Sequence, residues 1–165
     1  MASTASAELT IRFLTTMTPD TTTGITGDQH GDVEQTDRWT QGTGSSQVDR
    51  AYKRIRTIGI GATDSYNLLA AGSLEDIIGQ AIDADEAKAL VVLCTDGEIK
   101  VTGAAANGLG CFTAASEGNA LSEGQFVAIG LGKAGLDVTV NSKFDITETS
   151  GTATAAYTLG LIVAQ

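Results

Sequence analysis

Aromatic residues are scarce in this chain, and their scarcity limits both its core and the ligands it can bind. Only 5% of the 165 residues are Phe, Trp or Tyr, whereas 42% are hydrophobic. A core of that composition must be built from Ala, Val, Leu and Ile. The low aromatic content disfavours a carbohydrate cleft, because such clefts usually stack sugar rings on Trp or Tyr.

Basic residues, histidine and cysteine are also few. Ten Lys and Arg residues stand against twenty Asp and Glu residues, which gives a formal net charge of −10. Such an acidic chain repels phosphate, so we expect no nucleic-acid partner. Cys94 and Cys111 are too few for a disulfide scaffold, and burial in an apolar run would raise the pKa of the Cys94 thiol and make it unreactive. His30 is the only histidine and lies in a polar segment, so we expect no enzyme activity, no cofactor and no metal.

Long hydrophobic runs and proline are nearly absent. No stretch approaches the roughly 18 apolar residues of a membrane span, so no membrane partner is expected. The start of the chain, MASTASAELT, lacks the basic and apolar regions of a secretory signal, which predicts synthesis and retention in a cytoplasm. Twenty glycines against one proline indicate many tight turns in a single domain with an arm.

Alternation of apolar and polar residues predicts short strands along most of the chain. Strands of five to seven residues that recur about every ten residues are typical of an antiparallel β-sandwich, jelly roll or barrel. We therefore predict an all-β fold, an antiparallel and jelly-roll-like β-sandwich. The segments that carry this pattern are 8–14, 48–60, 87–94, 98–102, 124–132, 136–141, 143–148 and 157–163, with a shorter strand at 111–112.

Residues 65–103 are the stretch around which the rest of the chain is organised. Within it, the run AKALVVLC at 87–94 is apolar except for Lys88 and predicts a buried strand. Asp96 and Gly97 follow, and this pair is a strong signal for a two-residue β-hairpin, because glycine adopts positive φ without steric cost. The next strand alternates, with Ile99 and Val101 expected to face the core.

Two further segments within this framework are ambiguous. Leu74–Ile82 carries apolar residues at helical spacing, and Ser73 is a candidate cap, so a short helix of about two turns is predicted there. Gly130–Gly135 reads GLGKAG and matches the G-x-G-x-x-G pattern of dinucleotide sites. Such a site needs a helix after the glycines, whereas the following LDVTV predicts a strand, so we interpret the motif as a glycine-rich hairpin.

The polar segment at residues 15–47 divides the chain. It is dominated by Thr, Gly, Asp, Gln and Ser, and it cannot offset its own ordering entropy by burial. We predict an N-terminal strand and extended arm over residues 1–47 and a sandwich body over residues 48–165. Trp39 is a candidate anchor for the arm on a partner, although it could equally pack on its own domain. Asp28, His30, Asp32 and Glu34 alternate in this segment but do not match an EF-hand.

A basic cluster opens the body in the segment VDRAYKRIRTIGI at 48–60. Its Lys and Arg residues suit an exposed strand edge or an ion-pairing face, since charges on edges block unwanted strand pairing. Three residues are our candidates for contacts with a partner: Trp39, Tyr52 and Arg54.

Short packing and turn segments from Val48 onward form a recognisable set. They are VDRAY at 48–52, NLLAAGSLED at 67–76, IGQ at 78–80, AKAL at 87–90, GQF at 124–126 and YTLGLI at 157–162. By these segments the chain resembles a family of small structural proteins encoded in tailed-bacteriophage genomes, and the resemblance extends over roughly two-thirds of the chain. Ser122-Glu123-Gly124 departs from it, since the family often has a Pro-Gly turn there.

The resemblance implies a virion protein, and two roles remain open. The first is a capsid cement (decoration) protein, whose partners would be the major capsid protein and further copies of itself as a dimer or trimer on the capsid surface. The second is a fibre or spike module that binds a host-surface glycan. In the first role residues 15–47 would run as an arm over neighbouring major capsid proteins or sister subunits.

Overall fold

The structure is a computed structural model, and every regular element among its described residues is a β-strand. It describes residues 6–17, 29–41, 47–48, 50–69, 74–76, 79, 81–112, 118–132 and 134–164, with most of residues 6–17 and 29–41 described by their backbone alone. The all-β prediction is therefore confirmed for these residues.

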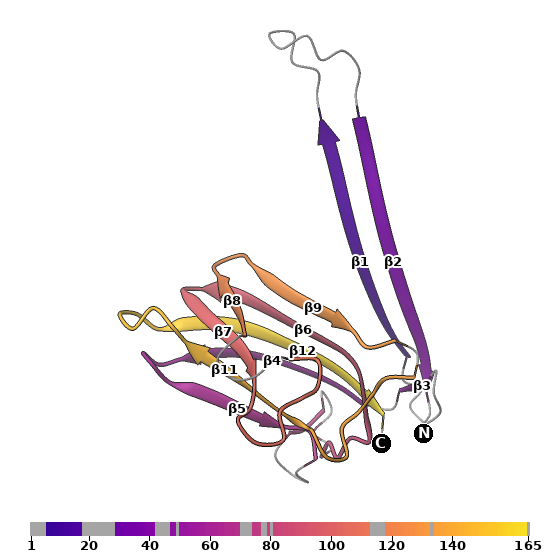
Figure 1. The fold of residues 1–165 in the computed structure, drawn as a ribbon. Coiled ribbons are helices and arrows are strands. Elements are labelled where there is room, and N and C mark those ends of the chain that lie inside the picture. The colour runs from indigo at the N-terminus through magenta and orange to yellow at the C-terminus, as the bar shows by residue number, and fades with distance from the viewer. Residues whose placement is uncertain are drawn as a thin grey trace, which may run out of the picture.

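The strands form three sheets (Figure 1). The N-terminal sheet contains β1 (Ser6–Met17), β2 (Gln29–Gln41) and β3 (Gln47–Val48). The second sheet contains β4 (Arg50–Ile58), β6 (Glu86–Asp96), β9 (Phe126–Gly130), β10 (Leu136–Asp137) and β12 (Ala155–Ala164). The third contains β5 (Thr63–Asn67), β7 (Glu98–Gly103), β8 (Asn119–Ser122) and β11 (Lys143–Glu148).

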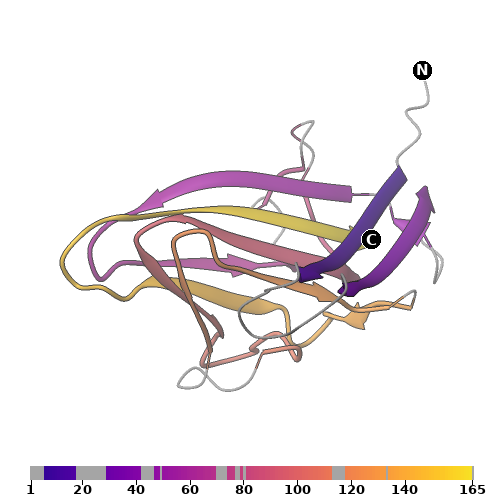
Figure 2. The ribbon, with the colours of Figure 1, turned by 90° about the horizontal axis from the view of Figure 1, so that it is seen from above.

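The second and third sheets pack face to face as an antiparallel sandwich (Figure 2). We call them the β4 sheet, in the order β9-β6-β12-β4 with β10 also on β6, and the β5 sheet, in the order β5-β11-β7-β8. Alternate residues of each strand enter one core between them. In β12 these are Tyr157, Leu159, Leu161 and Val163, and in β11 they are Phe144 and Ile146, as the alternation predicts.

The predicted hairpin at Asp96-Gly97 is wrong, because β6 and β7 belong to different sheets. β6 pairs with β12, β9 and β10, whereas β7 pairs with β11 and β8. Gly97 has φ of 70°, and a Cβ at this position would lie 2.9 Å from the Thr154 carbonyl oxygen. The glycine thus serves a sharp corner packed against another backbone. A local pattern reports that the chain turns, but it does not report which sheet the chain enters.

The GLGKAG segment is also not the predicted hairpin. β9 and β10 both pair antiparallel with β6, at Ala89 to Leu93 and at Glu86 to Ala87 respectively. β9 and β10 therefore lie one after the other along the same edge of β6, and the glycine-rich segment that connects them forms a loop. A strand, β10, follows the glycines, so the helix that would hold a dinucleotide phosphate is not there.

Lys88 explains this loop. It is the extra residue of a β-bulge against β12, because Ile162 pairs with Ala89 and Val163 with Ala87. Its side chain is fully buried, and its Nζ binds the Glu86 carboxylate and donates to the Ala134 carbonyl oxygen at 2.8 Å. The glycine-rich segment thus wraps the one lysine that interrupts the apolar run.

The segment Leu74–Ile82 does not show the predicted helix in its described residues. Glu75 and Ala81 form an antiparallel bridge, and the Ile82 amide donates to the Leu74 carbonyl oxygen at 2.9 Å. Leu74 and Ile82 are buried, so the apolar spacing marks contacts with the core rather than one face of a helix. Two weaker strand predictions also fail, since Cys111-Phe112 lies in a turn and only Leu136–Asp137 of the segment 136–141 is a strand.

The N-terminal segment is a long hairpin rather than a strand followed by an extended arm. β1 pairs antiparallel with β2 along its whole length, from Ser6 opposite Thr40 to Met17 opposite Gln29. β2 then pairs in parallel with β3 at Gln47 and Val48. The hairpin stands off the sandwich near the C-terminal end of β12 (Figures 1 and 2). Polar residues at 29–41 are therefore ordered by hydrogen bonds between the backbones of β1 and β2, which do not require burial of apolar side chains.

Candidate interaction surfaces

The outward face of the β4 sheet is apolar, although no part of the opposite sheet covers it. Residues directly opposite each other in a ladder lie on the same face, so the register defines three rows across this face. We call these rows the outer apolar face. They are Phe126-Leu93-Thr158-Ile55, Ala128-Val91-Gly160-Lys53 and Gly130-Ala89-Ile162-Ala51.

Two large side chains of this face are exposed to solvent. Ile55 is 72% exposed and Phe126 is 61% exposed, and they occupy the two ends of one row. Between the rows a groove of about 370 Å³ runs over Gly160 and is lined by Val91, Leu93 and Ile162. Contiguous apolar surfaces of this kind are typical of sites that contact proteins, membranes or other ligands.

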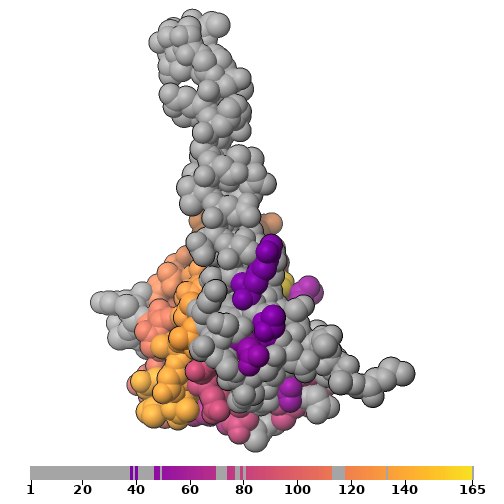
Figure 3. Space-filling model, turned by 90° about the vertical axis from the view of Figure 1, so that its right-hand side faces the viewer, coloured from indigo at the N-terminus to yellow at the C-terminus, as the bar shows by residue number. Residues whose placement is uncertain are grey.

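One end of the outer apolar face is already covered by the N-terminal segment. Val48 of β3 is 2% exposed and packs with Ala89 and the partly buried Ile162 in a small cluster of their own. β3 is also the strand that joins the body to the hairpin. Figure 3 shows violet patches from the stretch around residues 38–48 on the same side of the molecule as orange residues from the stretch around residues 120–140. The hairpin therefore begins at the edge of the outer apolar face.

The hairpin has two unlike faces by register. On one face Leu9 lies opposite Asp37, Ile11 opposite Gln35 and Phe13 opposite Val33, with Ala7 opposite Trp39. On the other face Glu8 lies opposite Arg38 and Arg12 opposite Glu34. Opposite charges at directly paired positions stabilise a ladder. The second face therefore suits solvent, whereas the first face combines apolar positions with a single charged residue, Asp37.

The structure separates the three predicted contact residues. Trp39 lies in β2 on the apolar face of the hairpin by register, and its side chain is outside the described part. Tyr52 is only 5% exposed and meets Tyr66 edge-on, with ring centroids 6.4 Å apart, so it packs in the core and offers a partner almost no surface. Arg54 is exposed and remains a candidate contact.

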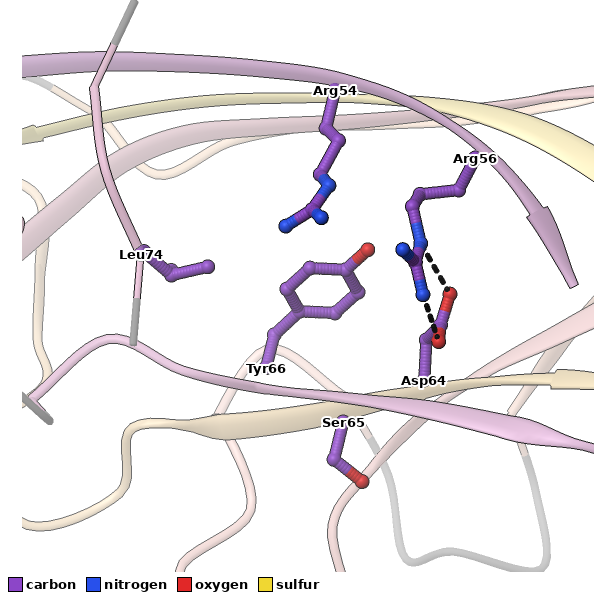
Figure 4. A pocket seen from close by; sticks show the side chains of 6 residues that line it. All are labelled: Arg54, Arg56, Asp64, Ser65, Tyr66 and Leu74. Carbon is purple, nitrogen blue, oxygen red and sulfur yellow. Dashed lines mark hydrogen bonds and ion pairs between the residues drawn. The ribbon is translucent and has the colours of Figure 1, made fainter. Parts of the chain in front are cut away.

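Arg54 and its neighbour Arg56 lie at the open side of the sandwich, where the edge strands β4 and β5 approach each other (Figure 4). β4 pairs with β12 alone among the described strands, which agrees with the predicted basic strand edge. Figure 4 shows both guanidinium groups directed toward β5, around a small pocket of about 100 Å³. Arg56 donates to both oxygens of Asp64, at 2.9 and 3.1 Å.

Two tyrosines continue this polar cluster into the core. The Tyr157 hydroxyl donates to Asp64 Oδ2 at 2.6 Å and lies 2.6 Å from the Tyr66 hydroxyl. Because the Tyr157 O–H already donates its hydrogen bond to the carboxylate, the Tyr66 O–H donates to the Tyr157 oxygen. Hydrogen bonds from Arg56 lower the pKa of Asp64, and burial raises the pKa values of Tyr66 and Tyr157. Both oxygens of Asp64 therefore accept hydrogen bonds, and the cluster closes this edge of the sandwich.

Other chemistry is sparse in the described part of the chain. Desolvation raises the pKa of the Cys94 thiol, as predicted, and raises that of Cys111 to about 11. Among the described residues no group of three or more His, Cys, Asp or Glu side chains is placed to hold a metal ion. In the same residues no helix is long and apolar enough to cross a membrane.

The fold and its surfaces define an antiparallel β-sandwich with an apolar outer sheet face and a projecting hairpin. Beyond that class, comparison with models of known protein families found no match, and a search of curated proteins found no significant similarity. The sequence signal for the outer apolar face was present in AKALVVLC, because a run apolar on both sides predicts cover on both faces of the strand.

Proposed function

We propose that this chain is a capsid cement (decoration) protein of a tailed bacteriophage. It binds the outer surface of the major capsid lattice and stabilises the mature head. The proposal combines the resemblance of residues 48–162 to phage structural proteins with the surfaces described above. The observation that carries it is the outer apolar face, because a sandwich that leaves one sheet face apolar is built to be covered by another protein.

The proposal includes a jelly-roll order of strands. The chain alternates between the β4 sheet and the β5 sheet at almost every connection, and only β7 and β8 are both sequential and adjacent in the β5 sheet. Two sheets of four main strands linked in this way are typical of jelly rolls, which are common in viral capsid and lectin domains. This is support by analogy of fold, since one fold hosts many functions.

The proposed mechanism is energetic. Packaged DNA pushes the shell outward, and a protein that bridges neighbouring subunits adds buried surface that must be lost before those subunits separate. A standard interface buries about 1,600 Å² in total, and repetition over the lattice adds avidity. The projecting hairpin suits bridging, because it extends away from the body toward a neighbouring major capsid protein or a sister copy. Symmetric lattice sites favour a symmetric oligomer of this chain.

The experiment that tests this proposal is immunogold electron microscopy of purified virions with antibody against the recombinant protein. Label distributed over the whole head supports a cement protein, and heads that lack the protein should then rupture more readily under osmotic shock. Label restricted to the tail tip or to one vertex contradicts it and favours the fibre or spike module. A glycan array with the purified protein then tests that second role directly.

A further inference from the structure

We infer that the outer apolar face binds the apolar face of the β1–β2 hairpin from a second copy of this chain. This inference makes the self-association within the proposed function specific. It concerns only contacts between copies, so it can be tested without a capsid. Three observations on the described residues carry it: continuity with an existing contact, matching dimensions, and matching charge.

Continuity comes from Val48. This residue already packs on Ala89 and Ile162 at one end of the outer apolar face, so the N-terminal sheet is a natural cover for that face. The rest of the face lies open, with Ile55 and Phe126 the most exposed large side chains on it. In the same chain, the parallel pairing of β2 with β3 directs the hairpin away from the body (Figure 1). The hairpin that covers the open part must therefore come from another copy.

Dimensions match between the two surfaces. The apolar positions of β1 run from Leu9 to Phe13, and the three rows run from Ala89 to Leu93 of β6, so each spans five residues, about 17 Å at the usual rise of a strand. A two-stranded ladder is also narrower than the row of β9, β6, β12 and β4. An isolated two-stranded hairpin is at best marginally stable in water. Packing its apolar face on the apolar rows of the β4 sheet supplies the third layer that such a hairpin needs.

Charge matches as well. Lys53 is the only charged residue in the three rows of the outer apolar face. Asp37 is the only charged residue at the register positions that form the apolar face of the hairpin. A single opposite charge on each of two apolar surfaces fixes their register, since a displaced hairpin would leave both charges without a partner among apolar groups.

The first test measures self-association of the full-length protein by sedimentation velocity over a range of concentrations. We expect the wild type to form a dimer or larger closed oligomer. The substitutions Phe126→Asp and Ile55→Asp should each weaken association at least tenfold. Matched controls are Ile60→Asp and Val140→Asp, because Ile60 and Val140 are 57% and 67% exposed and lie outside the three rows. A monomeric wild type, or equal weakening by the controls, overturns the inference.

The second test uses the charge pair. Lys53→Asp and Asp37→Lys should each weaken association, and the double variant that exchanges the two charges should recover most of the wild-type affinity. Recovery is expected only if the two residues meet, because each single change alone brings like charges together. Additive losses in the double variant contradict the proposed register.

The third test separates contacts between copies from contacts within one chain. Chains with Ile11→Cys are mixed with chains with Ile55→Cys, both in a Cys111→Ser background, and treated with a short bismaleimide. A mixed dimer shows contact between copies, and Thr10→Cys in place of Ile11→Cys is the control on the opposite hairpin face. If cross-links appear only when both cysteines are in one chain, the hairpin folds back on its own body and the inference is wrong.

The outcomes are distinguishable from those of the proposed function. A monomer that still labels the whole phage head would overturn the hairpin exchange and leave the cement proposal standing. If Phe126→Asp weakens self-association but the antibody does not label phage heads, the contact between copies is supported and the cement proposal is contradicted.

Discussion

The outward faces of the β4 sheet and the β5 sheet are built from similar antiparallel strands but differ in polarity. On the β5 sheet the outward rows contain Lys100, Thr147 and Thr63 in one line and Thr102, Asp145 and Ser65 in the next. On the β4 sheet the corresponding positions hold Phe126, Leu93, Ile55 and their apolar neighbours. An antiparallel sheet can face water on one side when that side is polar. The outward rows of the β5 sheet are therefore polar, although Thr102 among them is buried, whereas those of the β4 sheet are mostly apolar.

The largest expected effect compares the inner and outer faces of the β4 sheet. Leu159 is fully buried in the core, so Leu159→Ala should lower the free energy of unfolding by about 2–5 kcal/mol. Leu93 lies on the outer face and is partly exposed. In dilute monomer, Leu93→Ala should therefore lower the free energy of unfolding by less than about 1.5 kcal/mol.

Urea unfolding at several protein concentrations measures both substitutions. If another copy covers the outer face, the cost of Leu93→Ala should grow with protein concentration, because association stabilises the folded state by mass action. A cost of Leu93→Ala that equals that of Leu159→Ala at all concentrations would show that the two faces are equally buried within one chain.

The second prediction concerns the corner that sends β6 and β7 into different sheets. Gly97→Ala should cost about 2–4 kcal/mol, because Ala is strained at φ of 70° and its Cβ would meet the Thr154 carbonyl oxygen at 2.9 Å. Gly151→Ala is the matched control, since Gly151 has φ of 67° and nothing within 4 Å of the added atom. Thermal unfolding of both variants isolates the contact, and equal losses would mean that only the backbone angle matters.

The third prediction concerns the polar closure between the edges of the two sheets. Asp64→Asn removes the ion pair with Arg56 and weakens the acceptor of the Tyr157 hydroxyl, so we expect a loss of about 1–2 kcal/mol near pH 7. Because the pKa of Asp64 is lower in the folded state, its contribution is present above the unfolded pKa of about 3.9 and is lost as the pH falls through the folded pKa.

Denaturant titrations at about pH 7 and about pH 2 check this linkage. The difference in unfolding free energy between wild type and Asp64→Asn should shrink at the lower pH. Glu148 has a lowered pKa because the Gly61 amide and Ser150 donate to its carboxylate, and it destabilises both proteins alike on acidification. A difference that stays constant with pH would show that the Asp64 charge does not stabilise the fold.

The smallest effect is expected on the polar outward face. Thr147→Val removes an exposed hydrogen bond to Thr63 of 2.9 Å and should change the unfolding free energy by less than about 0.5 kcal/mol. It should leave self-association unchanged, in contrast to Ile55→Asp on the other sheet. Sedimentation velocity and urea unfolding measure the two quantities on one sample. A loss of association in Thr147→Val would mean that both outward faces take part in binding.

Local sequence patterns predicted most strands but not their partners. The alternation in Lys143–Glu148 and around Tyr157 to Val163 reports burial correctly, because each side chain in a strand faces one of two sides. The Asp96-Gly97 signal failed because a turn with positive φ serves a hairpin and a corner between sheets equally well. The order of the sheets depends on contacts between residues far apart in sequence, which no local window contains.

The candidate surfaces were predicted less well than the fold. The charge of Arg54 predicted its exposed position at the sheet edge. Tyr52 instead packs in the core, because its side chain lies on the inner face of β4 and contacts Tyr66. The outer apolar face joins residues from β9, β6, β12 and β4, which lie far apart in the chain. Only the register of the strands shows that these residues form one surface.

The all-β class, the acidic net charge and the alternation that separates inside from outside follow from the amino-acid sequence alone, because they depend on residue type and on spacing within a strand. Three features became visible only in the folded molecule: the chain crosses between two sheets at Gly97, the glycine-rich segment contacts Lys88, and β1 and β2 pair in a projecting hairpin. Those outcomes depend on which strands pair, and pairing is set by long-range packing of the whole core rather than by any single segment.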